Sequence, residues 1–427
     1  NDGRRRATEV TIPAALAGVL ERSGDADWFR FQAKKGQRLR LRAWARGLGS
    51  PLDAVVDLYV AGGRRLAGND DAGGRPDSEV TAAIPEDGAY ELRVRDFMDT
   101  GSPLHVYAVE VAPVEPALSL DLQTYGRNSQ ARNALTVPRG NRMAVLVRVT
   151  REAASGPIVL DAADLPAGVA PVATAVCAAD IATVPLVLEA APDAPLAGAM
   201  VALTGRLEKQ PGLVGALRQR VPLTFGYPNN AVYWTRTLER LAVAVAEPVP
   251  FRVRVVEPGA PLVRDGVAEV EVLVEREAGF DKPVLLSLLQ DSPGTGSRKE
   301  VRVEKDKDRA TIQVTANGRA ALGRWPLVVV AHANAGQGEL WASSQLAHVE
   351  VAAPFVRVER PRVAGAQGTT IELACEVTVD RAFEGEATAR LLGLPPHVSA
   401  PAQTFTKDAR VLRFPIAIGA AARVGRH

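Results

Sequence analysis

Hydrophobic and polar residues alternate along much of the chain with a period of two residues. The clearest example is residues 38–45, where aliphatic residues alternate with Arg38, Arg40, Arg42 and Trp44. The same alternation recurs at residues 90–95, 145–149 and 371–377. Successive side chains of a strand point to opposite faces of its sheet, so this pattern predicts half-buried antiparallel strands.

Short turn signals separate these strands. Clusters of Gly, Asp, Glu and Pro occur at residues 61–63, 71–74, 86–88 and 257–259. Few segments show a long period of 3.6 residues, so we expect little helix. Many short strands at regular spacing predict an all-β chain of tandem β-sandwiches.

Three breaks divide the chain into four predicted units. Residues 112–116 form a Pro-containing extended linker, residues 226–230 a turn-rich junction, and residues 352–354 a third boundary. The predicted units are 1–113, 114–227, 228–352 and 353–427. The last three resemble diverged repeats with the order strand, turn, strand, Leu-Pro turn. The second and third are expected to close with strands near 221–225 and 348–351. The fourth stops early by comparison, so we expect it to be incomplete.

Composition narrows the class of protein further. The chain has 427 residues, a formal net charge of +2 and 47% apolar residues, which excludes a disordered or collagen-like chain. No apolar run approaches the roughly 18 residues of a membrane-spanning helix. The near-zero net charge gives no long-range electrostatic attraction for nucleic acid.

Residues 1–6 are polar and expected to be flexible. The start shows no secretory segment, so the chain is either cytoplasmic or a mature or trimmed piece of an exported protein.

Residues 18–111 resemble the bacterial pre-peptidase C-terminal domain. The resemblance rests on Gly-Asp-Ala-Asp-Trp-Phe-Arg-Phe at 24–31, Lys-Gly-Gln at 35–37, Leu-Asp at 52–53, Gly-Asn-Asp-Asp at 68–71, Asp-Ser at 77–78 and Asp-Gly-Ala-Tyr at 87–90. It implies a non-catalytic, jelly-roll-like sandwich that accompanies secreted bacterial enzymes and surface proteins. Some members bind calcium and collagen, and others are associated with carbohydrate. The Leu-Pro turns of the later units resemble immunoglobulin-like modules of large exported bacterial proteins.

Acidic loops of the first unit are the main candidate site. Calcium takes six to eight oxygen ligands from carboxylates, amides and carbonyls on turning backbone, and calcium is therefore a possible cofactor here. The alternative is that the same residues only satisfy turn backbone through their side-chain oxygens. The candidate calcium ligands are Asp25, Asp27, Asp53, Asn69, Asp70, Asp71 and Asp77.

A basic strand face is a second candidate site. Arg38, Arg40, Arg42 and Trp44 share one face, which predicts a surface for an anionic glycan with the indole stacking on sugar. Arg30, Arg93 and Arg95 are candidates to extend it. The alternative is an ordinary solvated face whose arginine stems cover apolar surface.

Motifs of catalysis are not found in the sequence. The five histidines are scattered and form neither an HxxxH nor an HExxH pattern. No GxSxG, Walker A or Rossmann pattern occurs in a suitable setting, and residues 294–297 are interpreted as a hairpin loop. Cys375 lies on an apolar strand face and Cys177 in another unit, so an intradomain disulfide is excluded.

These observations predict a non-catalytic fragment of an exported bacterial protein, secreted or at the cell surface. Its role is expected to be surface attachment (adhesion), extracellular structure or binding of a protein or polysaccharide partner, with self-association as a further option. The alternative is an accessory substrate-binding region of a secreted hydrolase whose catalytic domain lies outside this chain. Stacked sandwiches are expected to form a stiff rod with exposed loops and edges for contacts.

Overall fold

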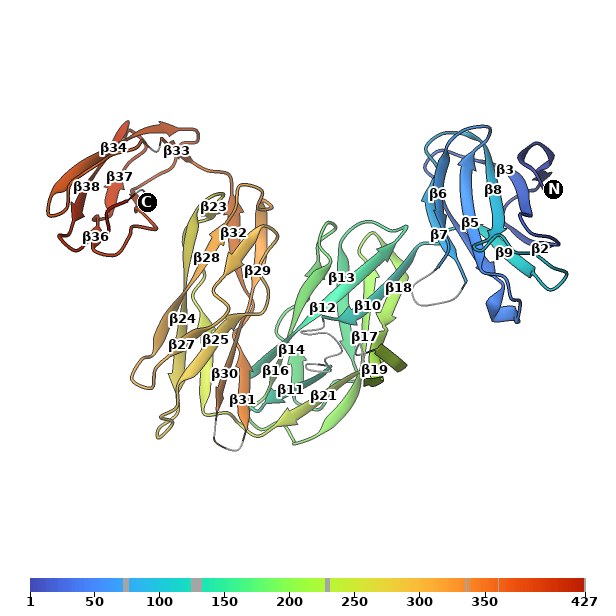
Figure 1. The fold of residues 1–427 in the computed structure, drawn as a ribbon. Coiled ribbons are helices and arrows are strands. Elements are labelled where there is room, and N and C mark those ends of the chain that lie inside the picture. The colour runs from blue at the N-terminus through green and yellow to red at the C-terminus, as the bar shows by residue number, and fades with distance from the viewer. Residues whose placement is uncertain are drawn as a thin grey trace.

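The chain folds into four successive units built almost entirely of β-strands (Figure 1). This computed structural model describes residues 1–71, 77–123, 133–226, 231–334, 336, 338–359 and 361–425. Residues 72–74 of the acidic loop, 227–230 of the predicted junction and His427 lie outside those ranges. Within them, helix is limited to two short 3₁₀ turns, η1 (Arg4–Arg6) and η2 (Arg46–Leu48). The prediction of tandem β-sandwiches is confirmed.

The first sandwich packs a five-stranded sheet, in the order β1-β3-β8-β5-β6, on a four-stranded sheet, in the order β2-β9-β4-β7. Between the two sheets lies a core that includes Phe31, Leu39, Leu41 and Tyr90, all inaccessible to solvent. Its strands are β1 (Thr8–Glu9), β2 (Ala14–Val19), β3 (Ala26–Ala33), β4 (Arg38–Trp44), β5 (Ala54–Val60), β6 (Arg65–Asn69), β7 (Glu79–Ala83), β8 (Gly88–Asp96) and β9 (Val106–Pro113).

The N-terminal residues are packed against this sandwich, which corrects the expectation that residues 1–6 are flexible. Asn1 and Trp28 exchange main-chain and side-chain hydrogen bonds, with the Trp28 N–H donating to the Asn1 carbonyl at 3.1 Å. β1 then pairs in parallel with β3 at the edge of the five-stranded sheet. The segment is ordered because its polar groups find partners on that edge, which composition alone does not reveal.

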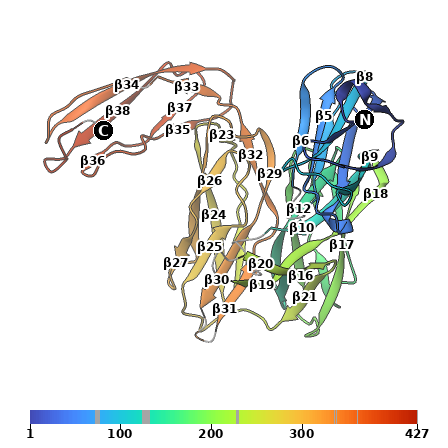
Figure 2. The same cartoon turned by 45° about the vertical axis from the view of Figure 1, so that its right-hand side comes forward.

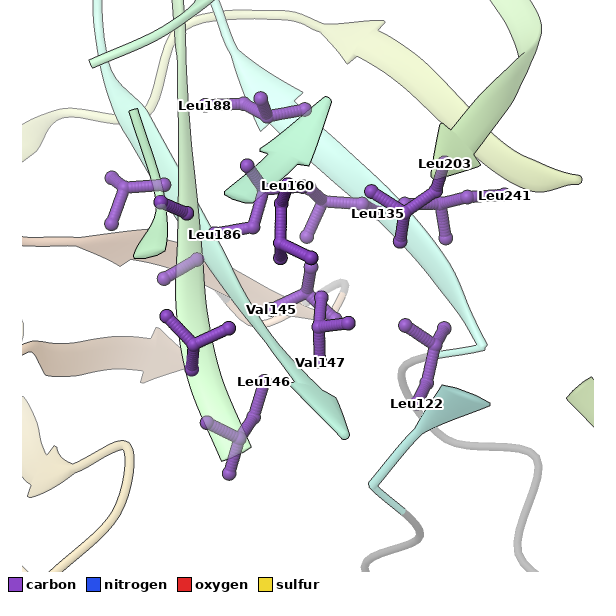
Figure 3. Packing of buried hydrophobic residues seen from close by; sticks show 14 of the residues in the cluster. Leu122, Leu135, Val145, Leu146, Val147, Leu160, Leu186, Leu188, Leu203 and Leu241 are labelled. Carbon is purple, nitrogen blue, oxygen red and sulfur yellow. The ribbon is translucent and has the colours of Figure 1, made fainter. Parts of the chain in front are cut away.

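The second sandwich surrounds a core of aliphatic side chains contributed by many strands (Figure 3). Its main sheet runs in the order β11-β21-β17-β18-β10-β12-β16-β14, with β13 and β15 joined to it through β17. Its strands are β10 (Ala117–Leu122), β11 (Ala134–Pro138), β12 (Arg142–Glu152), β13 (Ile158–Ala163), β14 (Val169–Pro171), β15 (Val176–Cys177), β16 (Thr183–Ala190), β17 (Gly198–Leu207), β18 (Gln210–Leu217), β19 (Gln219–Gly226), β20 (Ala231–Leu238) and β21 (Leu241–Ala246).

The strand pairing of this unit differs from the expected boundary at residues 227/228. β19, expected as the closing strand, pairs with β20 in a separate two-stranded hairpin. β21 closes the sandwich instead, because it pairs in parallel with β11 and antiparallel with β17 and buries Leu241, Val243 and Val245. By strand pairing, the second sandwich therefore continues to Ala246.

The third sandwich comprises three sheets, in the orders β22-β24-β28-β26, β23-β32-β29 and β27-β25-β30-β31. Residues 295–297, expected in a hairpin loop, form the short strand β26 on β28. Its strands are β22 (Phe251–Val255), β23 (Leu262–Val263), β24 (Val267–Arg276), β25 (Val284–Leu288), β26 (Thr295–Ser297), β27 (Val301–Val303), β28 (Arg309–Ala316), β29 (Gly323–Leu327), β30 (Val329–Asn334), β31 (Glu339–Ser343) and β32 (Ala347–Ala352).

The second and third sandwiches pack against each other (Figures 1 and 2). In the predicted half-buried strand at 145–149 the outer face is covered at Leu146, which is 1% exposed, while Arg148 on the same face stays exposed. Val328 and Val330 of the third sandwich belong to the same hydrophobic cluster as Leu146. The buried side-chain amide of Asn141 donates to the Phe251 carbonyl at 2.8 Å across the joint. These contacts replace the expected end-to-end rod with a lateral contact between the two middle units.

The fourth unit has the smallest core of the four. A four-stranded sheet, in the order β33-β34-β38-β36, lies beside a two-stranded sheet of β35 and β37. Leu373, Cys375, Phe405 and Phe414 are among its seven buried hydrophobic residues. Its strands are β33 (Val356–Val358), β34 (Thr370–Val379), β35 (Ala387–Ala389), β36 (Val398–Ser399), β37 (Gln403–Phe405) and β38 (Val411–Ile418).

Candidate functional site

Two candidate calcium ligands lie at the start of β3, beside the opposite sheet. Asp27 is 6% exposed, and its Oδ2 accepts a 2.5 Å hydrogen bond from the Tyr107 hydroxyl of β9. Burial raises the pKa of Asp27, the Tyr107 hydrogen bond opposes that rise, and the charge of Asp25 adds to it. Burial and the Asp27 acceptor raise the pKa of Tyr107. Asp25 Oδ2 accepts from the Glu21 N–H at 2.8 Å, whereas its buried Oδ1 has no hydrogen-bond partner among the described residues.

A second group of acids gathers where β5 begins and β6 ends. Asp53 forms an ion pair with Arg46 at 3.0 Å. Burial raises the pKa of Asp53, Arg46 opposes the rise, and the nearby charges of Asp71, Asp96 and Asp70 add to it. β6 pairs with β5 in the register Val56 to Asn69, which places Asp70 and Asp71 on the side of Asp53.

Asn69 and Asp77 use their side chains to hold turns. Asn69 Oδ1 accepts from the Asp70 N–H at 3.0 Å, and its Nδ2 donates to the Glu79 carbonyl at 3.1 Å. Asp77 accepts from the N–H groups of Ala45, Arg46 and Gly47 at 2.8–3.1 Å, so it caps the first turn of η2. Such Asx contacts are the turn chemistry that the sequence offered as the alternative to metal.

Asp96, which the sequence reasoning missed, is the most extensively bonded acid of these loops. It is 2% exposed and accepts from the main-chain N–H groups of Asp53, Met98 and Thr100 and from the Thr100 hydroxyl. Burial alone raises the pKa of Asp96, but these hydrogen bonds outweigh it and lower that pKa. Asp96 is the last residue of β8 and does not stand in a Gly-rich cluster, so it carried no loop signal.

The seven candidate ligands therefore fall into three places rather than one. Asp25 and Asp27 adjoin Tyr107, Asp53 lies with Asn69, Asp70 and Asp71, and Asp77 holds η2. In the described part of the chain, no three acidic, histidine or cysteine side chains are grouped as a metal site requires. Calcium binding by these loops and turn chemistry without a metal therefore both stay as alternative predictions.

The predicted basic face of β4 exists, but it is narrower than expected. Arg38, Arg40, Arg42 and Trp44 alternate with buried core residues, and the Arg42 guanidinium stacks 3.9 Å from the indole centroid. Arg40 forms an ion pair with Glu152 of the second sandwich, so part of this face belongs to the joint between units. Both Arg40 and Arg42 lie within 3.7 Å of Glu79.

Arg30, Arg93 and Arg95 do not extend that face, because they belong to the other sheet. Their strands, β3 and β8, lie in the five-stranded sheet, whereas β4 lies in the four-stranded one. Alternation along a strand identifies a face but not the sheet to which it belongs. The outward face of the five-stranded sheet is thus a separate arginine-rich surface.

Two buried carboxylates organise this second surface, and the sequence reasoning did not single them out. Glu91 is 1% exposed and pairs with Arg4 at 2.5 Å and Arg30 at 2.7 Å. Asp57 is 1% exposed and pairs with Arg65 and Arg93, each at 2.6 Å. Burial alone raises the pKa of Glu91, but the hydrogen bonds from Arg4 and Arg30 outweigh it and lower that pKa.

Among the described residues, His105, both cysteines and one hollow have structural surroundings. His105 is 8% exposed and contacts the Thr100 and Ser102 hydroxyls. Cys177 and Cys375 are buried free thiols in different units, and burial raises the pKa of each. A hollow of about 110 Å³ at the joint of the middle sandwiches, lined in part by Ile181 and Gln290, is smaller than ordinary ligand pockets of roughly 300 Å³ or more.

Comparison with known proteins identifies the first sandwich. Residues 25–96 match the model of the bacterial pre-peptidase C-terminal domain, which confirms the resemblance read from the sequence. A probable subtilase-type serine protease of Deinococcus radiodurans is 40% identical over 111 residues. The match covers 22% of this chain and 15% of that protein, so the chain spans a small part of this relative.

Solved structures are similar to parts of the chain at low identity and with low TM-scores. The pre-peptidase C-terminal domain of a Bacillus anthracis collagenase is 14% identical, with 25% of this chain and 94% of that domain covered and a TM-score of 0.20. Fibronectin(III)-like modules of Clostridium thermocellum CbhA are 8% identical, with 55% and 93% covered and a TM-score of 0.16. No described helix is long and apolar enough to cross a bilayer.

Proposed function

We propose that this chain is a non-catalytic region of an exported bacterial protein and serves surface attachment, extracellular structure or partner binding. The observation that carries the proposal is its architecture: a pre-peptidase C-terminal domain at residues 25–96, followed by three further β-sandwich units. Sandwiches in series present loops and sheet faces to partners while their interiors serve stability.

The surroundings of the acidic residues support a non-catalytic role. A catalytic carboxylate needs an oxygen directed at a bound substrate. Asp77 and Asp96 instead direct theirs at main-chain N–H groups, and Glu91 directs both of its oxygens at arginines. These acids stabilise loops and a sheet face, as is expected in a non-catalytic binding domain.

A second candidate is an accessory substrate-binding region of a secreted hydrolase, with the catalytic domain outside these residues. The similarity to a probable subtilase-type serine protease favours this candidate, since the matched segment lies in the first sandwich. Binding of protein substrates is the expected property in that case, and binding of cell-wall polymers is expected for an attachment region.

Co-sedimentation with insoluble ligands tests the proposal and separates the two candidates. The chain is mixed with chitin, cellulose, peptidoglycan, collagen fibrils and denatured casein particles, each with and without calcium. We expect retention on at least one ligand that exceeds retention of bovine serum albumin. Retention on peptidoglycan supports attachment, whereas retention on collagen or casein alone supports the hydrolase candidate. No retention on any ligand contradicts a binding role.

A further inference from the structure

The short helix η1 is anchored beside the turn that joins β5 to β6. The Arg4 Nη2 donates to the carbonyls of Val60 and Gly63, each at 3.0 Å, while its Nε pairs with Glu91 at 2.5 Å. The Gly62 N–H of the same turn donates to Glu91 at 3.3 Å. One buried carboxylate thus fixes both the helix, which carries Arg5 and Arg6, and the turn, which carries Arg64.

Those three arginines are exposed and carry uncompensated charge. Arg5, Arg6 and Arg64 are exposed side chains, and none has an ion pair or hydrogen bond to another described side chain. Arg65, next along the turn, is 52% exposed although it pairs with Asp57. We call Arg5, Arg6, Arg64 and Arg65 the arginine edge.

The arginine edge continues into the outward face of the five-stranded sheet. Arg30 of β3 is in register there with Glu91 of β8, and Arg93 of β8 with Asp57 of β5, while Arg95 lies two residues further along β8. With Arg4, the edge and the face together hold eight arginines against four carboxylates, Glu9, Asp57, Glu91 and Asp99, which leaves four positive charges. Because residues 1–113 contain slightly more acids than bases, this excess reflects segregation of charge within the sandwich rather than its total.

The chemistry of the surface favours one class of anion. Every cation on it is arginine, whose planar guanidinium forms paired hydrogen bonds with carboxylate and sulfate oxygens. The arginines stand at fixed positions on a sheet, and ion pairs with Asp57 and Glu91 restrain them. This limits the conformational entropy that is lost when a polymer binds. A flat face with charges spread over several strands fits an extended polyanion better than a small ion.

Two other polyanionic partners fit less well. Insertion into an anionic bilayer requires exposed large apolar side chains beside the cations. Among the described residues none lies on η1, β3, β5, β6 or β8, and the exposed Phe97 and Met98 follow β8 at the end of the sheet opposite the β5–β6 turn. Single-stranded nucleic acid requires open aromatic faces for stacking. Trp28 and Tyr59 are instead covered by the guanidinium groups of Arg4 and Arg93, at 4.9–5.7 Å from the ring centroids.

We propose that the arginine edge and the adjoining sheet face bind an acidic polysaccharide, through its uronate or sulfate groups. This inference rests on the proposed binding role and names the ligand class for it. Bound carboxylates replace chloride and water around Arg5, Arg6 and Arg64, while Arg4 and Glu91 keep their ion pair. Binding is therefore expected to depend strongly on ionic strength.

Alginate is the test ligand, and neutral dextran is the control. Affinity of the full chain is measured by biolayer interferometry in 20 mM and 300 mM NaCl. We expect alginate binding that weakens about tenfold or more at the higher salt concentration, and no dextran binding. The triple variant Arg5→Ser/Arg6→Ser/Arg64→Ser should bind alginate at least about tenfold more weakly at low salt.

A matched variant controls for the loss of three charges. Arg206→Ser/Arg218→Ser/Arg236→Ser removes three exposed arginines of the second sandwich and should change alginate affinity less than about twofold. Equal losses in both triple variants, or no alginate binding by the unmodified chain, overturn the inference. Stronger binding to single-stranded DNA or phosphatidylglycerol vesicles, with the same dependence on Arg5, Arg6 and Arg64, also overturns it by replacing the ligand class. If alginate fails while another ligand of the co-sedimentation panel is retained, the inference falls and the proposed function stands.

Discussion

The hydroxyl of Tyr107 donates a 2.5 Å hydrogen bond to the Asp27 carboxylate, and this contact joins the two sheets of the first sandwich. Tyr107 lies on β9 of the four-stranded sheet and Asp27 on β3 of the five-stranded sheet. Both side chains are buried, at 2% and 6% exposed. The sandwich therefore contains a polar inter-sheet bond within a largely aliphatic core.

The raised pKa of Asp27 predicts how this bond depends on pH. The folded protein holds the Asp27 proton more tightly than the unfolded chain, so the associated stability is present at low pH and is lost as pH rises through the raised pKa. We expect Asp27→Asn to keep the Tyr107 hydrogen bond without an ionisation penalty. Its midpoint of thermal unfolding should equal or exceed that of the unmodified chain at pH 7, and the difference should shrink at pH 4.

Tyr107→Phe provides the contrast. It leaves Asp27 buried without its donor and should lower the free energy of unfolding by about 1–3 kcal/mol at pH 7. Asp96→Asn tests a pH dependence of stability that has the opposite sign. The pKa of Asp96 is lowered, so its contribution is present at neutral pH and lost as pH falls through the folded-state pKa. If Asp27→Asn is as destabilising at pH 7 as Tyr107→Phe, the assignment of a raised pKa to Asp27 is wrong.

The buried carboxylate of Glu91 is predicted to anchor the N-terminal helix. Glu91→Ala removes the acceptor of both Arg4 and Arg30, but those arginines are 32% and 34% exposed and can turn to water. We therefore expect a loss of about 1–3 kcal/mol in the free energy of unfolding, below the cost of stranding a fully buried charge. Amide hydrogen exchange of residues 4–6 should also accelerate.

Glu9→Ala is the matched control for Glu91→Ala. Glu9 pairs with Arg30 at 3.3 Å but is 66% exposed, so solvent screens that pair and its loss should cost less than about 1 kcal/mol. Equal effects of the two substitutions on stability and on exchange of residues 4–6 would contradict an anchoring role for Glu91.

The pairing of β21 predicts where the second sandwich can be cut. A fragment of residues 114–248 should unfold cooperatively, whereas a fragment of residues 114–227 should lack a cooperative thermal transition. The shorter fragment loses Leu241, Val243 and Val245 from the core and exposes the edges of β11 and β17. Circular dichroism during heating measures both. A cooperative transition in the shorter fragment would place β21 outside the folding unit.

Calcium binding is tested by melting the chain in 5 mM calcium chloride and in 5 mM EDTA. Because Asp77 and Asp96 already direct their oxygens at main-chain donors, we expect the midpoints of the first sandwich to agree within about 1 °C. A ligand that binds only the folded state raises stability by about 2.7 kcal/mol at a hundredfold excess over its dissociation constant. A rise of several degrees in calcium, abolished by Asp53→Asn, would establish the predicted metal site instead.

The strands could be predicted from the sequence because burial of one sheet face makes hydrophobic and polar residues alternate along the chain. Leu39 and Leu41 alternate with arginines for that reason, and so do Leu92 and Val94. The cover over Leu146 was not predicted, because nothing local shows that another sandwich packs against that face. The cluster at residues 226–230 signalled a turn, but a hairpin and a domain junction use the same residue types.

The candidate site was harder to predict, because it depends on which sheet each strand joins. Arg40 and Arg93 have the same local pattern, yet they face opposite sides of the sandwich. Asp96 carried no turn signal although its carboxylate organises the loop to Thr100. Arg4 gains its role only through Glu91 and the Val60 and Gly63 carbonyls, which are distant in sequence.

Whether the chain cleaves anything is the most direct test of the account. The purified chain is incubated with casein, gelatin, alginate and peptidoglycan, and new amino termini and reducing ends are quantified against a heat-denatured sample of the same chain. We expect no increase in either kind of end on any substrate, including a ligand that retains the chain in co-sedimentation. Cleavage that co-purifies with the 427-residue chain and disappears on its denaturation would contradict a non-catalytic role.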